Sequence, residues 1–230
     1  MASSSAALDK YRERPVLLTM SSFMSRGKRR AETLAAVSSL LGAHAQEEQR
    51  LLREVIVINE YDANRREDFG HAVRQVCPRV EFIQKGPNQR GQARTLNMIL
   101  DRLAGYEYWI HWEESWVCTK PFIARALDVM TTTDLIQLQV TNNWLDVGSD
   151  RLRPSATAEG TRFVRVLPHS RTADLIRGVD VAGYDRLISQ VGFGQGWPLY
   201  SLLPSINRAA FCREVGRFDE DGRLWPFKFE

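Results

Sequence analysis

Two adjacent carboxylates, Glu113 and Glu114, end an apolar and aromatic run over residues 106–112 (YEYWIHW). Such a run is typical of a buried strand, and open α/β sheets bind ligands at the carboxyl ends of their strands. Paired carboxylates at that place suit a divalent cation with oxygen ligands, which would in turn hold phosphate. The structural alternative is that both are the first solvated residues after a core strand.

Three further side chains are candidates for binding a polar ligand. Glu60 and Asp62 follow a second apolar run, residues 54–59 (EVIVIN), and could accept hydrogen bonds from a ribose or a base. A polar turn is the alternative for both. Arg94 begins a predicted helix, where its guanidinium and the helix dipole both favour an anion. Its alternative is an exposed arginine in the first turn.

Aromatic and histidine side chains lie near the carboxylates or in loops. Trp112 is one of several tryptophans that could stack on a base or a sugar, although a buried tryptophan is more often a core residue. His111 is interpreted as a structural or supporting histidine, and strand alternation puts it on the face opposite Trp112. His169 lies in a predicted loop and is a better candidate for contact with phosphate or metal.

Strand and helix patterns alternate three times in the first half of the chain. Apolar strand patterns, each followed by a helix pattern, occur at residues 15–20, 54–59 and 80–84, with the helices at 28–41, 68–76 and 92–103. This alternation predicts an α/β fold with a central, mostly parallel sheet flanked by helices. The polar residues 1–14 are predicted to be a flexible lead-in.

The second half is less regular and predicts a smaller antiparallel portion. A helix pattern at residues 121–130 is followed by a strand pattern at 134–141 and by a predicted loop at 142–161. A loop of that length is typical of a functional lid. Residues 161–167 alternate polar and apolar, which predicts an exposed or edge antiparallel strand. A Pro-marked turn and a short helix at 208–215 follow.

Composition excludes some classes of protein. The 230 residues suit one large α/β domain or two small ones. A net charge of +3, with no long basic stripe, does not indicate nucleic acid. The three cysteines lack the spacing of a disulfide framework or a zinc site, and no apolar stretch is long enough for a signal peptide or an integral membrane segment. A cytoplasmic protein is expected.

Five segments, taken in order, resemble the nucleotide-sugar-dependent glycosyltransferases of the GT-A fold, most closely those of family-2 type. They are PVLLTMSSFMSR, EVIVINEYDAN, NQRGQARTLNMIL, YWIHWEESW and YSLLPSINRAAFCREVGRFDED. The resemblance implies a single GT-A-type domain, in which residues 15–120 form the nucleotide-sugar-binding half and residues 121–230 the acceptor-side half.

The resemblance also implies a set of donor-binding and metal-binding residues. The acidic motif falls on Glu113, Glu114 and Ser115, where the family binds Mn²⁺ or Mg²⁺ and the donor diphosphate. The chain departs from the family in having a serine at the last position, where a carboxylate is common. His169 is added as a candidate metal contact. The predicted donor contacts are Thr19, Ser21, Arg26, Glu60, Asp62, Gly91, Arg94, Asn97 and Trp112.

The implied activity is transfer of a sugar from a nucleoside diphosphate sugar, UDP-linked, to a hydroxyl of a carbohydrate or other acceptor, with inversion. Inversion requires a carboxylate that takes the acceptor proton. Glu230 matches the approximate position of the family's base, and Asp219 and Asp221 lie in the same region. Asp219 could instead cap a helix.

Three other functions are alternatives to a glycosyltransferase. The altered acidic motif would also suit a catalytically weak or inactive GT-A module that binds a sugar nucleotide or a partner. A sugar nucleotidyltransferase would need a glycine-rich loop after the first strand, which SSFMSRGKRR lacks. A dehydrogenase would need GFGQG, residues 192–196, to follow a buried strand, and no clear strand precedes it.

Overall fold

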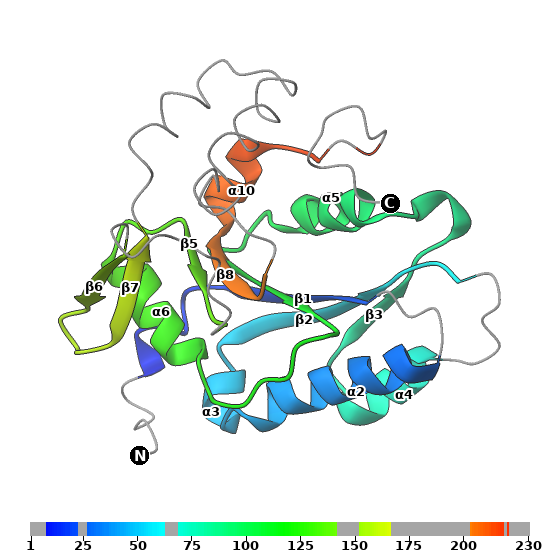
Figure 1. The fold of residues 1–230 in the computed structure, drawn as a ribbon, viewed down its shortest axis with the longest axis horizontal. Coiled ribbons are helices and arrows are strands. Elements are labelled where there is room, and N and C mark those ends of the chain that lie inside the picture. Colours follow the sequence, from blue (N-terminus) through cyan, green and yellow to red (C-terminus); the bar gives the residue numbers. More distant parts are fainter. Residues whose placement is uncertain are drawn as a thin grey trace.

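A computed structural model describes residues 8–22, 27–62, 69–141, 152–166, 203–218 and 220. These residues form a six-stranded sheet with helices on both faces and a separate two-stranded sheet (Figure 1). The predicted α/β fold with a mostly parallel central sheet and a smaller antiparallel portion is confirmed.

In the six-stranded sheet, the order of the strands differs from their order along the chain. From one edge to the other the strands are β3 (Glu81–Gln84), β2 (Leu52–Asn59), β1 (Val16–Ser22), β4 (Tyr108–Glu113), β8 (Ser205–Arg208) and β5 (Gln137–Gln139). The first four are parallel, and β8 is antiparallel to both of its neighbours. The chain moves outward from β1 to β2 and β3, then returns to β4 on the other side. The carboxyl ends of β1 and β4 are therefore the switch point at which such sheets bind ligands.

Strand register brings the predicted site residues to this edge. Ser21 pairs with Ile58 on one side and with Glu113 on the other. Asn59, the last residue of β2, pairs with Ser22 and with Gln84. The ends of four parallel strands thus lie in one line, with a carboxylate at the end of β4.

The helices form a layer on each face of the sheet. On one face lie α2 (Gly27–Gly42), α4 (Phe69–Val76) and α6 (Ile123–Thr132), with the short α3 (Gln46–Gln49); on the other lie α5 (Gln92–Arg102) and α10 (Ala209–Val215). Figure 1 shows α2 and α4 below the strands and α5 and α10 above them. The helices α4, α5, α6 and α10 confirm the helix patterns at 68–76, 92–103, 121–130 and 208–215.

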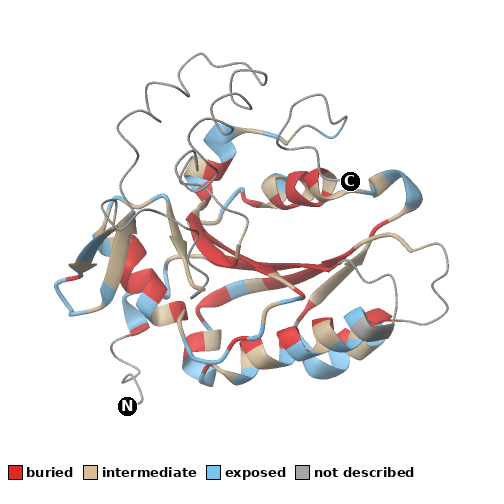
Figure 2. Ribbon diagram, viewed as in Figure 1, coloured by how far each residue is buried: buried red, intermediate tan, exposed pale blue. Residues whose placement is uncertain are grey.

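The strands form the centre of the core (Figure 2). Because strand side chains alternate between faces, β1 contributes Leu18 and Met20 to the core under α2 and Leu17 to the core under α5. Trp109 is buried on the α5 face, and its Nε1 donates a hydrogen bond to Thr19 Oγ1 at 2.8 Å.

The two-stranded sheet agrees with the sequence-based expectation in one strand and differs from it in the other. β6 (Leu152–Ala156) pairs with β7 (Arg162–Val166) in an antiparallel ribbon. The ribbon confirms the antiparallel strand predicted at residues 161–167, but β6 lies inside the predicted loop at 142–161, so that prediction was wrong for these five residues. Its sequence, LRPSA, lacks an alternating pattern, and only pairing with β7 makes it a strand.

The described N-terminal residues pack against the domain. Leu8 and Tyr11 are buried at 3% exposure, and Tyr11 Oη donates to Asp128 Oδ1 on α6 at 3.4 Å. The three cysteines are buried and free. Of the helices in the described part of the chain, none is both long enough and apolar enough to cross a membrane.

Candidate active site

The carboxylate pair lies where β4 ends and a tight turn begins. The side chain of Glu113 is 24% exposed and that of Glu114 is 8% exposed, while Ser115 is exposed in the turn. Burial, and then the negative charge of Glu114, raise the pKa of Glu113 to about 7. The ionised form of Glu113 therefore lacks enough positive charge around it, and a bound cation would supply that charge.

An arginine of α2 reaches the same pair. Arg29 Nη1 lies 3.5 Å from Glu114 Oε1. The helix that carries it is joined to β1 by a hydrogen bond between Ser22 Oγ and Thr33 Oγ1 at 3.0 Å. Arg29 thus places a positive charge beside the carboxylates, which an anionic ligand could share.

His111 lies in β4, two residues before Glu113. Burial lowers its pKa to about 4, so the ring is neutral at pH 7. Its Nε2 is 4.0 Å from Glu113 Oε1, beyond hydrogen-bond distance, and its ring meets Trp109 edge-on at 5.3 Å between centroids. Neither ring nitrogen has a hydrogen-bond partner within the described residues, and the same holds for Ser21 Oγ. His111 is buried in the sheet, and its predicted structural or supporting role stays a prediction.

The donor set fits a hard divalent cation held by few protein groups. Across the described ranges, no three His, Cys, Asp or Glu side chains converge on one point. Two carboxylates, one of them desolvated, are nevertheless the oxygen ligands that Mg²⁺ and Mn²⁺ prefer, and these ions keep ligand positions for water and phosphate. His169, the other predicted metal contact, lies outside the described residues.

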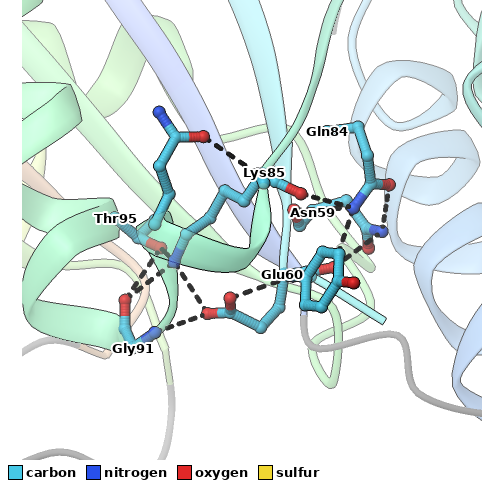
Figure 3. Close-up of polar contacts among 9 residues, drawn as sticks. Asn59, Glu60, Gln84, Lys85, Gly91 and Thr95 are labelled. Carbon is cyan, nitrogen blue, oxygen red and sulfur yellow. Dashed lines mark hydrogen bonds and ion pairs between the residues drawn. The ribbon is translucent and has the colours of Figure 1, made fainter. Parts of the chain in front are cut away.

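A buried lysine joins the ends of β2 and β3 to the start of α5 (Figure 3). Lys85 Nζ donates to Glu60 Oε2 at 2.7 Å, to the carbonyl of Gly91 at 2.8 Å and to Thr95 Oγ1 at 2.8 Å. The amide of Gly91 donates to the same Glu60 oxygen at 3.1 Å. Burial lowers the pKa of Lys85, and Glu60 opposes that shift. Sequence reasoning missed Lys85, a lone lysine directly after an apolar strand.

Gly91 gives both of its backbone groups to this network because of its conformation. Its φ of 94° is in the left-handed region that favours glycine. The other oxygen of Glu60 accepts from the amide of Tyr61 at 2.9 Å. Both carboxylate oxygens of Glu60 therefore have partners in the chain, and its predicted contact with the donor stays a prediction.

The rim of this network consists of polar and aromatic groups. Asn59 Nδ2 donates to Gln84 Oε1 at 2.8 Å, and Gln84 Nε2 donates to the carbonyl of Glu60 at 2.9 Å. The guanidinium of Arg90 lies over the Tyr61 ring at 4.7 Å. These contacts, together with those of Lys85, hold Asn59, Glu60 and Tyr61 at the end of β2.

The first turns of α5 hold the segment that follows α10. Asn97 is buried, and its Nδ2 donates to the carbonyl of Phe218 at 2.9 Å while its Oδ1 accepts from the amide of Phe218 at 2.8 Å. The same Nδ2 donates to Glu220 Oε1 at 2.6 Å, and Arg94 forms an ion pair with Glu220. We call these contacts the α5 clamp. Sequence reasoning put Arg94 and Asn97 at the donor and did not anticipate it.

The remaining predicted residues are divided between the core and the undescribed parts of the chain. Thr19 is buried against Trp109, and Trp112 is buried and stacked on Phe122 at 5.5 Å. Trp112 is therefore a core residue in this structure, and its predicted stacking on a donor remains a prediction. The predicted residues outside the described ranges are Arg26, Asp219, Asp221 and Glu230.

Solved structures provide the comparison with known proteins. No protein-family model matches the sequence, and no curated protein is similar enough to match it. The mannosyltransferase PcManGT from Pyrobaculum calidifontis, solved with GDP-Man and Mn²⁺, superposes with a TM-score of 0.51 at 13% identity, over 90% of this chain and 48% of that one. Glucosyl-3-phosphoglycerate synthase of M. tuberculosis superposes with a TM-score of 0.50 at 10% identity, over 91% and 62%.

Both superpositions include nearly all of this chain but less than two thirds of the other protein. At 10–13% identity, what is shared is the fold. In this chain, the central sheet carries a carboxylate pair at the switch point between β1 and β4. The order of the five sequence segments predicted this outcome, and the chain has the fold of the nucleotide-sugar-dependent glycosyltransferases of the GT-A type.

Proposed function

We propose that this chain transfers a sugar from a nucleoside diphosphate sugar, UDP-linked, to an acceptor hydroxyl with inversion. One observation carries the proposal: in a GT-A-type sheet, Glu113 and Glu114 stand together at the end of β4, and the pKa of Glu113 is raised to about 7. A carboxylate whose ionised form is disfavoured by its surroundings binds a cation favourably, because the positive charge of the cation stabilises the ionised form.

The donor is proposed to lie along the carboxyl edge from β3 to β4. Its nucleoside would contact the loop of Tyr61 and Asp62, which the Lys85 network holds in place. Its diphosphate would lie at the carboxylate pair, near Arg29. The GDP-Man and Mn²⁺ bound by the mannosyltransferase support a nucleotide sugar and a divalent ion here, without deciding the base.

Negative charge develops on the diphosphate as it leaves the sugar. Mn²⁺ or Mg²⁺, when bound, supplies electrostatic stabilisation of that charge, and Glu113 and Glu114 would hold the ion. Arg29, 3.5 Å from Glu114, would add a second positive charge beside the same oxygens. Because Ser115 carries no charge, the donor phosphates would complete the ligand set.

Inversion also requires a carboxylate on the acceptor side. Asp219, Asp221 and Glu230 are the proposed candidates. The α5 clamp supports an acceptor-side role for these candidates, because it holds Phe218 and Glu220, their neighbours in sequence, against a helix of the donor half. Replacing Glu230 by Gln should lower transfer by roughly 10² while donor binding persists; loss confined to Asp219→Asn or Asp221→Asn would assign the base to the FDED turn.

Thermal stabilisation by nucleotides tests the donor site directly, since ligand binding to the folded state raises the melting temperature. We expect UDP or another nucleoside diphosphate to stabilise the protein more with Mn²⁺ than with chelator. The double variant Glu113→Gln, Glu114→Gln should lose that difference, whereas Glu47→Gln, on the exposed face of α3, should keep it. Unchanged metal dependence in the double variant would contradict the proposal.

A module that binds sugar nucleotide without transfer is the second candidate, and the uncharged Ser115 in the acidic motif favours it. The two candidates separate in one measurement. Saturable, metal-dependent nucleotide binding without turnover, across donors and acceptors, would select the binding module.

A further inference from the structure

Polar side chains form a row across four adjacent strands of the central sheet. Strand register places Thr19 of β1 beside His111 of β4, His111 beside Ser205 of β8, and Ser205 beside Gln139 of β5. Laterally paired residues point to the same face, which is the face covered by α5 and α10. One step towards the carboxyl edge of β4, Ser21 lies beside Glu113 on that face. We call this set the polar floor: Thr19, Ser21, His111, Glu113, Ser205 and Gln139.

The polar floor differs from the rest of the same face. Under α5 and α10 the face consists of apolar residues such as Leu17, Ile56 and Trp109. Four members of the floor are nevertheless as deeply buried as that core, with at most 2% exposure: Thr19, Ser21, His111 and Ser205. Burial of a polar group costs free energy unless it is hydrogen-bonded, so such a row needs an explanation.

Only part of the row is satisfied by the protein itself. Thr19 Oγ1 accepts from Trp109, and Ser205 Oγ accepts from Asn207 at 3.2 Å and from Gln137 at 3.3 Å. Several buried atoms along this row have no hydrogen-bond partner among the described residues: Ser21 Oγ, both ring nitrogens of His111, Gln139 Nε2 and, two residues beyond Gln139, Thr141 Oγ1. Asn59 Oδ1 and Tyr108 Oη, which lie outside the row, are also buried and unpaired among those residues. The unpaired atoms of the row occur on β1, on β4 and at the end of β5, on both sides of the satisfied residues.

These unpaired groups match hydroxyls in their chemistry. A neutral histidine offers one donor and one acceptor, a serine or threonine hydroxyl offers both, and Gln139 offers an amide donor. Sugar hydroxyls likewise donate and accept. The floor contains no Lys or Arg, and its one ionisable carboxylate is Glu113. The six floor residues themselves therefore offer an anionic ligand no positive charge, so the floor suits a neutral ligand.

We propose that the polar floor binds the hydroxyl groups of a neutral carbohydrate acceptor, with His111 and Gln139 as contact residues. The inference rests on the proposed function and names the class of its acceptor. The floor begins on β1 and runs through β4, where Glu113 is 24% exposed, and through β8 to β5. It therefore extends away from β2 and β3, where the nucleotide is proposed to bind, and leaves the acceptor next to the carboxylate pair.

The test compares the effect of apolar substitutions on stability with their effect on binding. Replacing a satisfied polar residue by an apolar one destabilises a protein, whereas replacing an unpaired one is neutral or stabilising. His111→Phe and Gln139→Leu should therefore leave the ligand-free melting temperature unchanged or raised, while weakening saccharide binding about tenfold or more. Asn207→Leu is the matched control, because its amide donates to the Trp109 carbonyl and to Ser205, and it should lower the melting temperature.

Binding would be measured by calorimetry without donor, using neutral methyl glycosides and 3-phosphoglycerate as the anionic probe. Neutral glycosides should bind, and His111→Phe and Gln139→Leu should weaken their binding. Gln75→Leu, at an exposed position of α4, should leave it unchanged.

Preference for 3-phosphoglycerate, or destabilisation by both substitutions with unchanged glycoside affinity, would overturn the inference. Glycoside binding that depends on His111 and Gln139, with no transfer from any nucleotide sugar, would support the floor and refute the proposed function. Transfer with an unchanged acceptor KM in both variants would refute the floor alone.

Discussion

At the scale of single residues, Glu113 is a carboxyl group whose charged form is disfavoured in the folded protein. Its folded pKa of about 7 lies above its ordinary value of 4.5, with burial as the first cause and Glu114 as the second. A raised carboxyl pKa means that the folded state holds this proton more tightly than the unfolded state. Its contribution to stability is therefore complete below pH 4.5 and is lost as the pH rises through about 7.

Glu113→Gln should remove this pH dependence. Relative to the wild type, the variant should gain free energy of unfolding above pH 7, by at most about 3.5 kcal/mol at about 1.4 kcal/mol per pKa unit, with no gain near pH 4.5. Urea unfolding of both proteins at several pH values would measure the difference. His111, whose pKa is lowered to about 4, acts in the opposite sense below pH 6.5 and should affect both proteins alike. A difference that does not vary with pH would contradict the assignment.

Lys85 is expected to be the costliest single charge to remove. Lys85→Met would leave Glu60, which is 17% exposed, without its cation, and should lower the free energy of unfolding by about 3 kcal/mol. Adding Glu60→Gln should recover part of that loss. Lys120→Met, at an exposed position, is the control and should change stability by less than about 0.5 kcal/mol. A loss below about 1 kcal/mol for Lys85→Met would show that the network contributes little.

Glu113 and Lys85 also show which site residues can be predicted from the sequence and which cannot. The pair Glu113 and Glu114 could be found because two carboxylates directly after an apolar run conflict with core packing. Lys85 could not, because its partners Glu60 and Thr95 come from other segments and nothing in its own neighbourhood indicates burial. The α5 clamp was missed for the same reason, since Asn97 and Phe218 are 121 positions apart.

At the scale of elements, close contact between α4 and β3 depends on a glycine. A Cβ built on Gly70 would lie 2.6 Å from Phe82 Cδ1, and Phe82 also packs edge-on against Phe69. Gly70→Ala should therefore lower stability by about 1–3 kcal/mol through overpacking. Gly42, at the end of α2, has no atom within 4 Å of the corresponding position, so Gly42→Ala should stay within about 1 kcal/mol of the wild type. Thermal unfolding of both variants would show whether they separate in this order.

Element prediction succeeded where the apolar pattern was clear, including the four-residue β3 predicted at residues 80–84, and failed at β8. The strands β1, β2 and β4 and the helix α5 have six or more residues with a clear pattern. β8 has four, SINR, and two of them, Ser205 and Asn207, are buried polar residues. Because this part of the sheet is lined with polar groups, a central strand resembles a turn in sequence, and it was not predicted.

At the scale of the whole molecule, the N-terminal residues join parts that are distant in sequence. Asp128 of α6 accepts from Thr157 Oγ1 at 2.6 Å, in the turn between β6 and β7, and from Tyr11 Oη. Leu8 and Tyr11 belong to the same core as β1. The sequence suggested only a polar lead-in here, because two apolar residues among many small and charged ones form no pattern.

Leu8→Ala should accordingly destabilise the whole domain by about 2–3 kcal/mol, as expected for a buried leucine. Asp9→Ala is the neighbouring control: Asp9 is exposed and paired only at the surface, with Arg12 at 3.0 Å, and it should change stability by less than about 0.5 kcal/mol. Denaturant unfolding of both variants would test the difference. Equal, small effects would mean that residues 8–14 pack without contributing to stability.

The place of β8 between β4 and β5 has a consequence for the order in which the protein is made. On the ribosome, β1, β2, β3 and β4 can assemble once Glu113 has emerged. β5 must wait, since it joins the sheet through β8, and Gln137 and Asn207 are 70 positions apart. During that interval the outer edge of β4 is a nascent, unpaired strand edge, the kind of surface that chaperones shield and that aggregates form on. Insertion of β8 between β4 and β5 is therefore the step that completes the sheet, and it can occur only late in synthesis, after residue 208 has emerged.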